Sequence, residues 1–487
     1  MSGTGEKLQA QTHDHTVKRA KFQFLFPFML DDKEDIEKLT GKLRKENFIF
    51  FDFKDLDLQQ AFYGGDKVSH RKLEKSFMPN IEPLLFPGSQ HDKEGIRRFS
   101  KKFELECRLT SSQLDTPFFI ESTDVFLCPF RIGMVNIRVR LPENISYLDA
   151  VSFGDIFRVL EPITEDEEQI EVMAGGETYE EVKKFIFKKL LPPIDAYLED
   201  DPELDPSYFG SLPFFVDERM YVISYINLDS DSYISKMELY RAADLEGHRV
   251  DDEKYEGARN QRYIDRYCEN IVYDRWADET YIIMSEYHFS CLTKAEGKKE
   301  QNLAGRLYGE YFYSVLLFYY YKIILLKLSH DHSQIEIEKG KRSTERLILM
   351  ITQFTAKYYI PEVNSTASGK EIFSKLKATF LIDELYRDVK ETLTFLYQNQ
   401  NNISGKSMNY LLQILTIFTT ISGIFGMNLV IEDWKGKMDW AKMNDYSVFE
   451  WIAVLVTTTG VAVSLILGLI FLKDWMVEKK SRKKQIL

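Results

Sequence analysis

Two long runs of residues without a formal charge lie near the C-terminus of the chain, and they limit its architecture more than any other feature. The first run covers residues 407–431 and the second covers residues 451–472. A helix rises about 1.5 Å per residue, so either run can cross a hydrocarbon core roughly 30 Å thick. Uncharged runs of this length are rare in soluble domains. We therefore expect two membrane-spanning helices, with two buried helices of a soluble domain as the alternative.

Lysine and arginine residues gather on one side of this predicted pair of spans. Nine of them precede the first span or follow the second, and three lie in the connecting segment: Arg387, Lys390, Lys406, Lys473, Lys479, Lys480, Arg482, Lys483 and Lys484 against Lys435, Lys437 and Lys442. Positive charge near the span ends favours the cytoplasmic side. We expect a multi-pass protein of the plasma (inner) membrane with both termini cytoplasmic, an outer loop at 432–450 and a basic cytosolic tail at 473–487.

A third apolar stretch, residues 308–328, contains Lys322 in its interior. A lysine at that depth in lipid costs a few kcal/mol. An odd number of spans would also conflict with the charge asymmetry of the two predicted ones. We expect this stretch to be a buried helix of the cytosolic part.

The first 295 residues have the composition of a folded domain. Short runs rich in β-branched and aromatic residues alternate with helical ones, which predicts an α/β cytosolic domain over residues 20–295, after a disordered tail at 1–19. The strand candidates are residues 21–30, 48–53, 118–130, 134–141, 220–228 and 280–289, and a helix candidate is residues 180–198.

The net charge, the cysteines and the lack of catalytic motifs speak against several classes of function. A formal net charge of −13 speaks against general binding of nucleic-acid backbone. The four cysteines are far apart and form no CxxC pair, which is typical of reduced cytosolic thiols. No phosphate-binding loop, nucleophile elbow or HExxH motif is present, so we do not expect an enzyme.

From about residue 296 the pattern becomes helical, and we expect a helical stalk over residues 296–406. From Lys370 onward, apolar residues recur at the spacing of one face of a long helix that continues into the first span. They are Ile372, Leu376, Phe380, Leu381, Leu385, Val389, Leu393 and Leu396. Residues 399–405 are poor helix formers that end in a glycine, so they form either a hinge or an ordinary weak point of the helix.

Polar and small residues form a stripe along the first predicted span. They recur in steps of mostly three or four: Asn409, Gln413, Thr416, Thr419, Thr420, Gly423 and Gly426. On a lone helix that faces lipid such a stripe would be costly, so it belongs at a helix interface or against a water-filled lumen. Helix packing accounts for the small residues, whereas the amides of Asn409 and Gln413 fit a lumen better.

The outer end of this span carries the triplet Gly426-Met427-Asn428. With the run TIFTTISGIFGMN, the paired spans, the long preceding helix and the lysine-rich end, it resembles the CorA superfamily of magnesium transporters, over roughly residues 369–487. The resemblance implies a homopentameric funnel in which the first spans line one central pore. Gly426, Met427 and Asn428 would form the selectivity filter, and the amide oxygens of Asn428 would hold a hydrated Mg²⁺ ion.

The same resemblance implies further pore-lining positions. They are Asn402, Met408, Thr416 and Thr419, besides Asn409 and Gln413 of the polar stripe. The chain departs from the family at Ile417, where the family has a proline, and in its longer outer loop. Mg²⁺ is the first expected cargo, and Co²⁺, Ni²⁺ or Zn²⁺ remain alternatives.

Three functions follow from the resemblance. The first is a divalent-cation channel gated by its cytosolic domain, and the second is a zinc transporter similar to the ZntB branch. CorA-like proteins with enlarged cytosolic domains also act in type III CRISPR antiviral defence, responding to an S-adenosylmethionine–AMP conjugate. The third function is therefore a membrane effector gated by a nucleotide-type second messenger.

For a ligand of that kind we expect contacts from arginine side chains next to tyrosine rings. The candidates are Arg249, Arg259, Arg262 and Arg266. Acidic residues are interleaved with them, so a salt-bridged helix surface is the alternative.

Overall fold

The computed structural model describes residues 15–30, 36–63, 66, 68–160, 170–194, 212, 219–247, 258, 260–335, 341–426, 446–452, 454–455, 458–459 and 462. The contacts divide the chain into two units, Met1–Leu393 and Thr394–Leu487. The division falls inside one helix of 45 residues, α13 (Ile382–Gly426).

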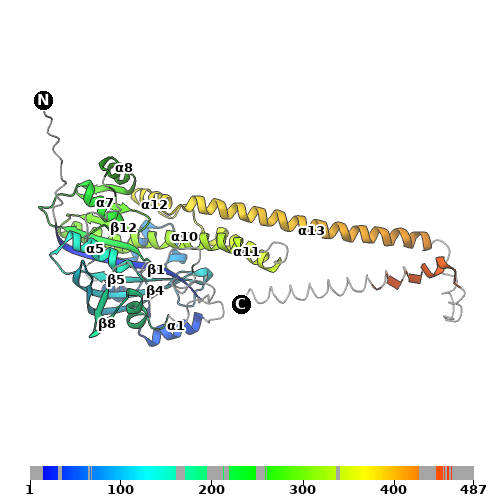
Figure 1. The fold of residues 1–487 in the computed structure, drawn as a ribbon, viewed down its shortest axis with the longest axis horizontal. Helices are drawn as coiled ribbons and strands as arrows, with labels where there is room; N and C mark the ends of the chain where they lie inside the picture. The colour runs from blue at the N-terminus through cyan, green and yellow to red at the C-terminus, as the bar shows by residue number, and fades with distance from the viewer. Residues whose placement is uncertain are drawn as a thin grey trace, which may run out of the picture. The chain divides into compact units, whose positions relative to one another are not determined.

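A mixed sheet of 12 strands runs through the first unit in the order β10-β11-β12-β9-β1-β5-β4-β3-β7-β8, with β2 paired to β3 and β6 to β1 (Figure 1). Among the described strands, every neighbouring pair is antiparallel except β12 with β9. The strands are β1 (Thr16–Met29), β2 (Ile49–Phe50), β3 (Arg97–Thr110), β4 (Asp115–Leu127), β5 (Ile132–Arg140), β6 (Ile145–Ser146), β7 (Glu171–Ala174), β8 (Glu177–Tyr179), β9 (Tyr221–Leu228), β10 (Val272–Ala277), β11 (Thr280–Met284) and β12 (His288–Thr293).

The prediction of a mixed α/β domain is confirmed, and each of the six strand candidates contains a strand. The candidate at 280–289 separates into β11 and β12, and β1 begins at Thr16, before the predicted start of the domain. The prediction missed β3. Its first part contains Arg97, Arg98 and Ser100, which are buried, whereas apolar and polar residues alternate from Phe103 to Thr110. This second part has the alternation of a half-buried strand, so the sequence did carry a signal for β3.

Helices cover both faces of the sheet. They are α1 (Ile36–Lys45), α2 (Leu56–Tyr63), α3 (His70–Ser76), α4 (Glu82–Leu85), α5 (Tyr147–Arg158), α6 (Val182–Phe185), α7 (Lys236–Asp244), α8 (Gln261–Ile271), α9 (Gly297–Arg306), α10 (Phe312–Ser333), α11 (Lys341–Gln353) and α12 (Ala367–Thr379), with short turns η1 (Pro129–Arg131), η2 (Ile186–Leu190), η4 (Leu307–Tyr311) and η5 (Phe354–Tyr358). On one face, the rings of Phe24 on β1 and Phe157 on α5 lie 4.8 Å apart. On the other, Phe312 of α10 lies 5.9 Å from Phe126 of β4.

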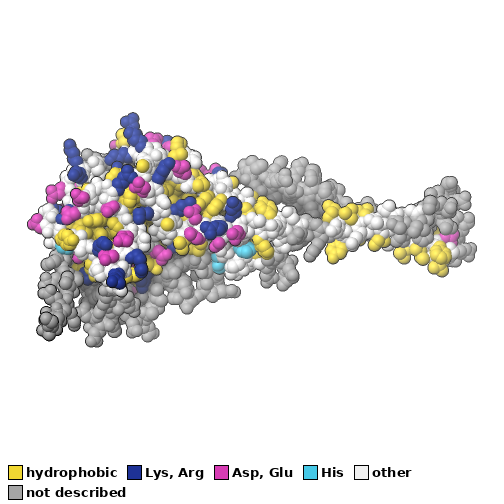
Figure 2. All heavy atoms as spheres, turned by 90° about the horizontal axis from the view of Figure 1, so that it is seen from above, with side chains coloured by type: hydrophobic (Ala, Val, Ile, Leu, Met, Phe, Trp, Pro, Cys, Tyr) yellow, Lys and Arg dark blue, Asp and Glu magenta, His cyan; other side chains and the backbone are white. Residues whose placement is uncertain are grey.

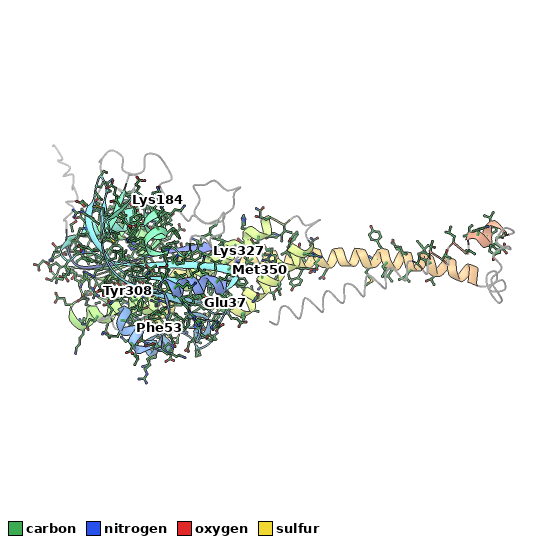
Figure 3. The ribbon with its side chains drawn as sticks, turned by 90° about the horizontal axis from the view of Figure 1, so that it is seen from below. Glu37, Phe53, Lys184, Tyr308, Lys327 and Met350 are labelled. Carbon is green, nitrogen blue, oxygen red and sulfur yellow. The ribbon has the colours of Figure 1, made fainter. Side chains whose placement is uncertain are left out.

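The apolar stretch at 308–328 lies in η4 and α10, and the prediction of a buried helix there is confirmed. Among the described residues, one helical stretch, Gly297–Ser333, is long and apolar enough to cross a membrane, and 78 % of its most apolar window is buried. Tyr308 and Phe53 lie among the side chains that fill this unit (Figure 3). Burial lowers the pKa of Lys322, whose ammonium lies 5.7 Å from the centroid of the Phe380 ring. A core helix of a folded domain accounts for these observations without lipid.

The single long helix expected from Lys370 onward is wrong, because the chain forms two helices, α12 and α13. Leu381 between them has a φ of 53°, in the left-handed region that ends helices. The break lets Phe380 stay buried, with its ring 5.5 Å from that of Tyr221, while Leu381 is 51 % exposed. In a continuous helix the two side chains would point only about 100° apart, so the break is what separates their surroundings. Residues 399–405, predicted as a hinge or a weak point, are helical throughout.

Asp124 forms the centre of a buried polar network on the α10 face of the sheet. Its Oδ1 accepts hydrogen bonds from Arg98 Nη2 at 2.8 Å and from Ser100 Oγ at 2.6 Å. Its Oδ2 accepts from Asn136 Nδ2 at 2.9 Å and lies 3.6 Å from Arg138 Nε. Asp124, Arg98 and Arg138 are all buried, so two positive charges and one negative charge are packed together away from solvent.

Two helices, α2 and α10, contribute tyrosine hydroxyls to this network. Arg98 Nη1 donates to the hydroxyl of Tyr63 on α2 at 2.6 Å and to that of Tyr313 on α10 at 3.1 Å. Burial by itself would raise the pKa of Asp124, but the charges of Arg98 and Arg138 and the hydrogen bonds to the carboxylate outweigh it and hold the pKa below its usual value. The network therefore stabilises an ionised Asp124.

We expect Asp124→Asn to destabilise the protein by about 3 to 5 kcal/mol, because it leaves Arg98 and Arg138 buried without a counter-charge. The matched control is Asp115→Asn on the same strand. Asp115 pairs with Arg108 of the same neighbouring strand, but both side chains are about half exposed, so its loss should change the free energy of unfolding far less than the loss of Asp124. Unfolding of the full chain, followed by circular dichroism, measures both. Equal losses in the two variants would contradict the role given to the network.

Candidate functional site

The predicted pore-lining residues lie on α13. Because this helix is continuous, their spacing in the sequence gives their directions. At about 100° per residue, positions 402, 409, 413, 416 and 423 fall within an arc of about 80°. The side chains of Asn409, Gln413 and Thr416 are exposed. The structure therefore places the central part of the polar stripe on one helix face.

The other predicted pore residues lie beside the stripe, at the end of α13 or beyond it. Met408 and Thr419 lie together on one flank of the stripe, about 80° to 100° from Asn409. Gly426 is the last residue of α13. Met427 and Asn428, which complete the predicted filter, lie outside the described residues.

Apolar side chains are exposed on the same part of α13. The helix has an apolar segment at Met408–Thr419. Within this segment, large apolar residues are between 47 % and 66 % exposed: Met408, Tyr410, Leu412, Ile414, Leu415 and Ile417. A helix that is apolar around most of its circumference is characteristic of a protein core or a membrane span, so this surface is suited to lipid or to other helices rather than to water.

The described part of the second predicted span is similar. Within it Trp451, Ile452 and Leu455 are between 42 % and 62 % exposed, and Val448 and Phe449, just before the predicted span, are 72 % and 67 % exposed. In the described surface of the second unit hydrophobic side chains predominate, whereas charged side chains of both signs are interspersed over the first unit (Figure 2). The two units therefore present different kinds of surface.

Ser447 and Glu450 mark the start of this second helix. The Glu450 carboxylate accepts from Ser447 N at 2.6 Å and from Ser447 Oγ at 2.7 Å, while Glu450 N donates back to Ser447 Oγ at 3.4 Å. This reciprocal arrangement is a capping box, which fixes where a helix begins. The helix thus starts at residue 448, three residues before the predicted start of the second span.

The threonine hydroxyls of these helices bond to their own backbone. Thr416 Oγ1 donates to Leu412 O and Thr419 Oγ1 donates to Leu415 O, each at 2.7 Å. Thr458 and Thr459 do the same with the carbonyls of Val454 and Leu455. Each hydroxyl proton therefore has an acceptor inside the helix, which removes the cost of placing an unpaired hydroxyl donor in an apolar environment.

Of the four arginines expected to contact a nucleotide-type ligand, two are described. Arg262 and Arg266 lie four residues apart on α8, where both are exposed, and Arg249 and Arg259 fall outside the described residues. The rings of Tyr263 and Tyr267 stack beside them at 5.8 Å. This arrangement leaves both interpretations of the segment, a ligand site or a helix surface with ion pairs, as predictions.

A cavity of about 430 Å³ lies between three segments that are distant in the sequence. Its walls come from α3, from α9 with η4, and from the start of α12. The lining includes three cationic side chains, one carboxylate and several hydroxyl groups: Lys72, Lys75, Arg306, Glu310, Ser69, Ser76, Thr366 and Ser368. Small-molecule sites in proteins have volumes of this order.

Hydrogen bonds hold the walls of this cavity together. Asn364 Nδ2 donates to Glu310 Oε1 at 3.2 Å, and Asn364 Oδ1 accepts from both the amide and the hydroxyl of Thr366 at 2.9 Å. Thr366 caps α12 by accepting from Gly369 N at 3.1 Å. A Cβ at Gly369 would lie 1.9 Å from Asn364 Oδ1, so the position requires glycine. Glu310 is thereby linked to the first turn of α12.

Sequence reasoning missed this cavity because none of its three segments carries a motif. A weak signal is the run of residues 304–310, AGRLYGE, in which two glycines four residues apart flank an arginine and precede a glutamate. Its structural counterpart is η4, a π-helical turn. Such turns are rare and are frequent at functional sites.

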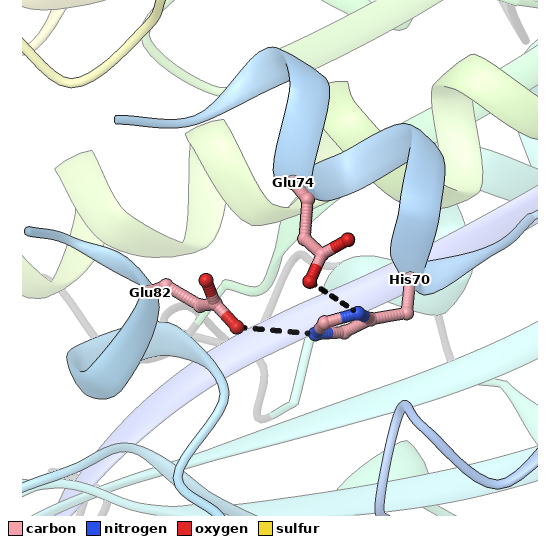
Figure 4. Close-up of side chains that lie close together, drawn as sticks. All are labelled: His70, Glu74 and Glu82. Atoms are coloured by element: carbon pink, nitrogen blue, oxygen red, sulfur yellow. Dashed lines mark ion pairs between the residues drawn. The ribbon is translucent and has the colours of Figure 1, made fainter. Parts of the chain in front are cut away.

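On the other face of α3, His70 lies between Glu74 and Glu82 (Figure 4). His70 Nδ1 is 3.2 Å from Glu74 Oε1, and His70 Nε2 is 3.4 Å from Glu82 Oε1. Among the described residues these three form a group that could offer ligands to a metal ion. However, the two carboxylates face opposite nitrogens of one ring, whereas one ion binds a ring through a single nitrogen. The geometry therefore does not favour one metal ion shared by the three side chains.

Comparison of the chain with models of protein families, with curated proteins and with solved structures gave no match. The features of this chain that point to a function are the polar stripe and exposed apolar surface of the second unit and the cation-lined cavity of the first.

Proposed function

We propose that the chain is a divalent-cation channel similar to the CorA superfamily, with Mg²⁺ as its cargo. It assembles as a homopentamer in the plasma membrane, and residues 407–431 and 451–472 of each chain span the bilayer with both termini in the cytoplasm. The central pore is lined by five copies of α13. The N-terminal unit gates it.

The observation that carries this proposal is the combination of two surfaces on one helix. Asn409, Gln413 and Thr416 share one face of α13, while apolar side chains from Met408 to Ile417 are exposed around the rest of it. Water around this helix would leave the apolar residues unburied, and lipid around all of it would leave two amides unsatisfied. A bundle with its polar faces turned to a central lumen satisfies both.

The chemistry of this lumen favours a hydrated hard cation. Mg²⁺ gives up its water reluctantly, so a pore for it needs neutral oxygen acceptors that bind the hydration shell. The amide oxygens of Asn409 and Gln413 and the hydroxyl oxygen of Thr419 are neutral acceptors of this kind.

The same residues speak against zinc as the main cargo. Zn²⁺ prefers imidazole and thiolate ligands, and residues 407–431 contain neither histidine nor cysteine. Among the candidate cargo ions we therefore rank Mg²⁺ first, Co²⁺ and Ni²⁺ next, and Zn²⁺ last.

The first prediction concerns assembly. The full chain, solubilised in detergent, should have five times the mass of one chain, because a shared lumen requires several copies of α13. Mass photometry measures this directly. A monomer or dimer at all protein concentrations would remove the proposed pore.

The second prediction tests the polar face. Gln413→Leu removes an acceptor from the lumen at constant volume and should lower Mg²⁺ flux into proteoliposomes by about ten-fold, since each lost hydrogen bond to a charged group is worth roughly 1.5 kcal/mol. Ile414→Leu is the control, because it lies about 100° further around the same helix turn. Flux should remain within about two-fold of wild type in the control. Equal effects of the two changes would show that the stripe does not face the permeating ion.

The third prediction concerns Asn428. Asn428→Ala should abolish selective Mg²⁺ flux, because it removes five acceptors at one level of the pore, each worth about 1 kcal/mol. Asn428→Asp should instead change block and selectivity, because five carboxylates at one level attract cations strongly and repel one another. Flux in proteoliposomes with Mg²⁺, Co²⁺, Ni²⁺ and Zn²⁺ is the measurement, with pentamer mass as the control for folding. Wild-type flux and selectivity in both variants would exclude Asn428 as the filter.

A further inference from the structure

We infer that the cavity between α3, α9–η4 and the start of α12 is a binding site for a small phosphate ester that also carries a hydrogen-bond donor, such as an amino group. Neither the polar stripe of α13 nor the sequence motifs involve this part of the molecule. The inference rests on four properties of the cavity: its cations, its buried carboxylate, its size and its position before α12.

Three cations favour an anionic ligand. Lys72 and Lys75 reach the cavity from α3, and Arg306 reaches it from the end of α9. The Arg306 guanidinium lies 3.8 Å from the ring centroid of Trp276, which restricts its orientation. An oriented guanidinium presents paired N–H donors that match the oxygens of a phosphate group.

The start of α12 adds to this preference. Thr366 and Ser368, at the N-cap and in the first turn of this 13-residue helix, line the cavity. The N-terminus of a helix carries a partial positive charge and unpaired backbone N–H groups, which favour anions. The helix end and the three cations therefore act on the same space.

Glu310 distinguishes this site from a plain phosphate site. Its carboxylate lines the cavity and is 9 % exposed, and the described partner of its Oε1 is the Asn364 amide at 3.2 Å. A carboxylate in an anion site repels a bare phosphate, so it lowers affinity unless the ligand brings a donor to it. An amino group on the ester supplies that donor.

The size of the cavity limits the rest of the ligand. A volume of about 430 Å³ is much larger than one phosphate ion requires and falls in the range of sites for small organic ligands. Gly305 and Gly309 form part of the wall, where they add no side chain. The ligand class is therefore a phosphate ester of about the size of a mononucleotide.

The position of the cavity connects it with α13. Glu310 is linked through Asn364 to Thr366, the cap of α12. Along the chain α12 is followed by the break at Leu381 and then by α13. A ligand that binds the Glu310 carboxylate therefore changes the hydrogen bonds of Asn364 and Thr366. Thr366 is the residue at which α12 begins. Its role as a gating signal rests on the proposed channel, whereas binding itself does not.

Isothermal titration of the full chain in detergent tests the binding. Three probes separate the features: AMP has a phosphate and an amino group, adenosine lacks the phosphate, and pyrophosphate lacks the amino group. AMP should bind at least about ten-fold more tightly than adenosine, because the phosphate meets charge-assisted donors. Equal affinities, or no binding of either AMP or pyrophosphate, would overturn the assignment.

Variants place the binding in this cavity. Lys72→Met with Arg306→Met should weaken AMP binding by at least about ten-fold. Arg71→Met with Lys299→Met is the matched control, because it removes the same charge from the same two helices at exposed positions outside the lining. Affinity should then change by less than about two-fold, as expected for distant screened charges. Equal losses in the two double variants would show that only bulk charge matters.

Glu310→Gln tests the donor requirement. It keeps the shape and an acceptor for Asn364 but removes the negative charge, so pyrophosphate should bind more tightly and the preference for AMP over pyrophosphate should fall. An unchanged preference would overturn the part of the inference that concerns the amino group. Binding with no ion flux under any condition would instead leave the cavity assignment intact and remove the channel, so the two proposals fail separately.

Discussion

Asp124 places a negative charge inside the sheet of the first unit, and three strands and two helices meet around the groups that neutralise it. Arg98 comes from β3 and Arg138 from β5, while Tyr63 and Tyr313 bring α2 and α10 onto the same guanidinium. A buried charge with incomplete partners is strongly destabilising. The position of α10 over the sheet, and with it the wall formed by η4, therefore depends on an arrangement that satisfies this one carboxylate.

The second unit is governed by a different constraint. The described part of α13 exposes apolar side chains over most of its circumference and a polar stripe along the remainder. No single solvent suits both surfaces, since water leaves the apolar area exposed and lipid leaves the amides without partners. The proposed pentameric channel follows from this conflict, because a lumen and a bilayer together provide both environments.

Along the chain, a helix cap at Thr366 and a left-handed residue at Leu381 lie between the core helix α10 and the helix α13. Leu381 ends α12 and lets Phe380 remain in the core of the first unit, and Thr366 begins α12 next to the cation-lined cavity. α12 therefore has a defined start and a defined end, each held by particular contacts. A segment of this kind can transmit a change at the cavity toward α13, which gives the proposed gating a structural route.

The sequence by itself determined the features that repeat along the chain. Runs rich in aromatic and β-branched residues predicted β1, β2, β4, β5, β9, β11 and β12. The lysine in residues 308–328 marked α10 as a buried helix, and the spacing of Asn409, Gln413 and Thr416 predicted one helix face. These are local periodicities, which secondary structure converts directly into geometry. Only the tertiary structure decided the network of Asp124, with the burial of Arg98 on β3, and the cavity. Lys72, Arg306 and Thr366 are separated by long stretches of sequence and share no motif, so their meeting depends on how α3, α9 and α12 pack. Such long-range contacts are set by the packing of the whole domain and cannot be inferred from the local pattern of a single sequence.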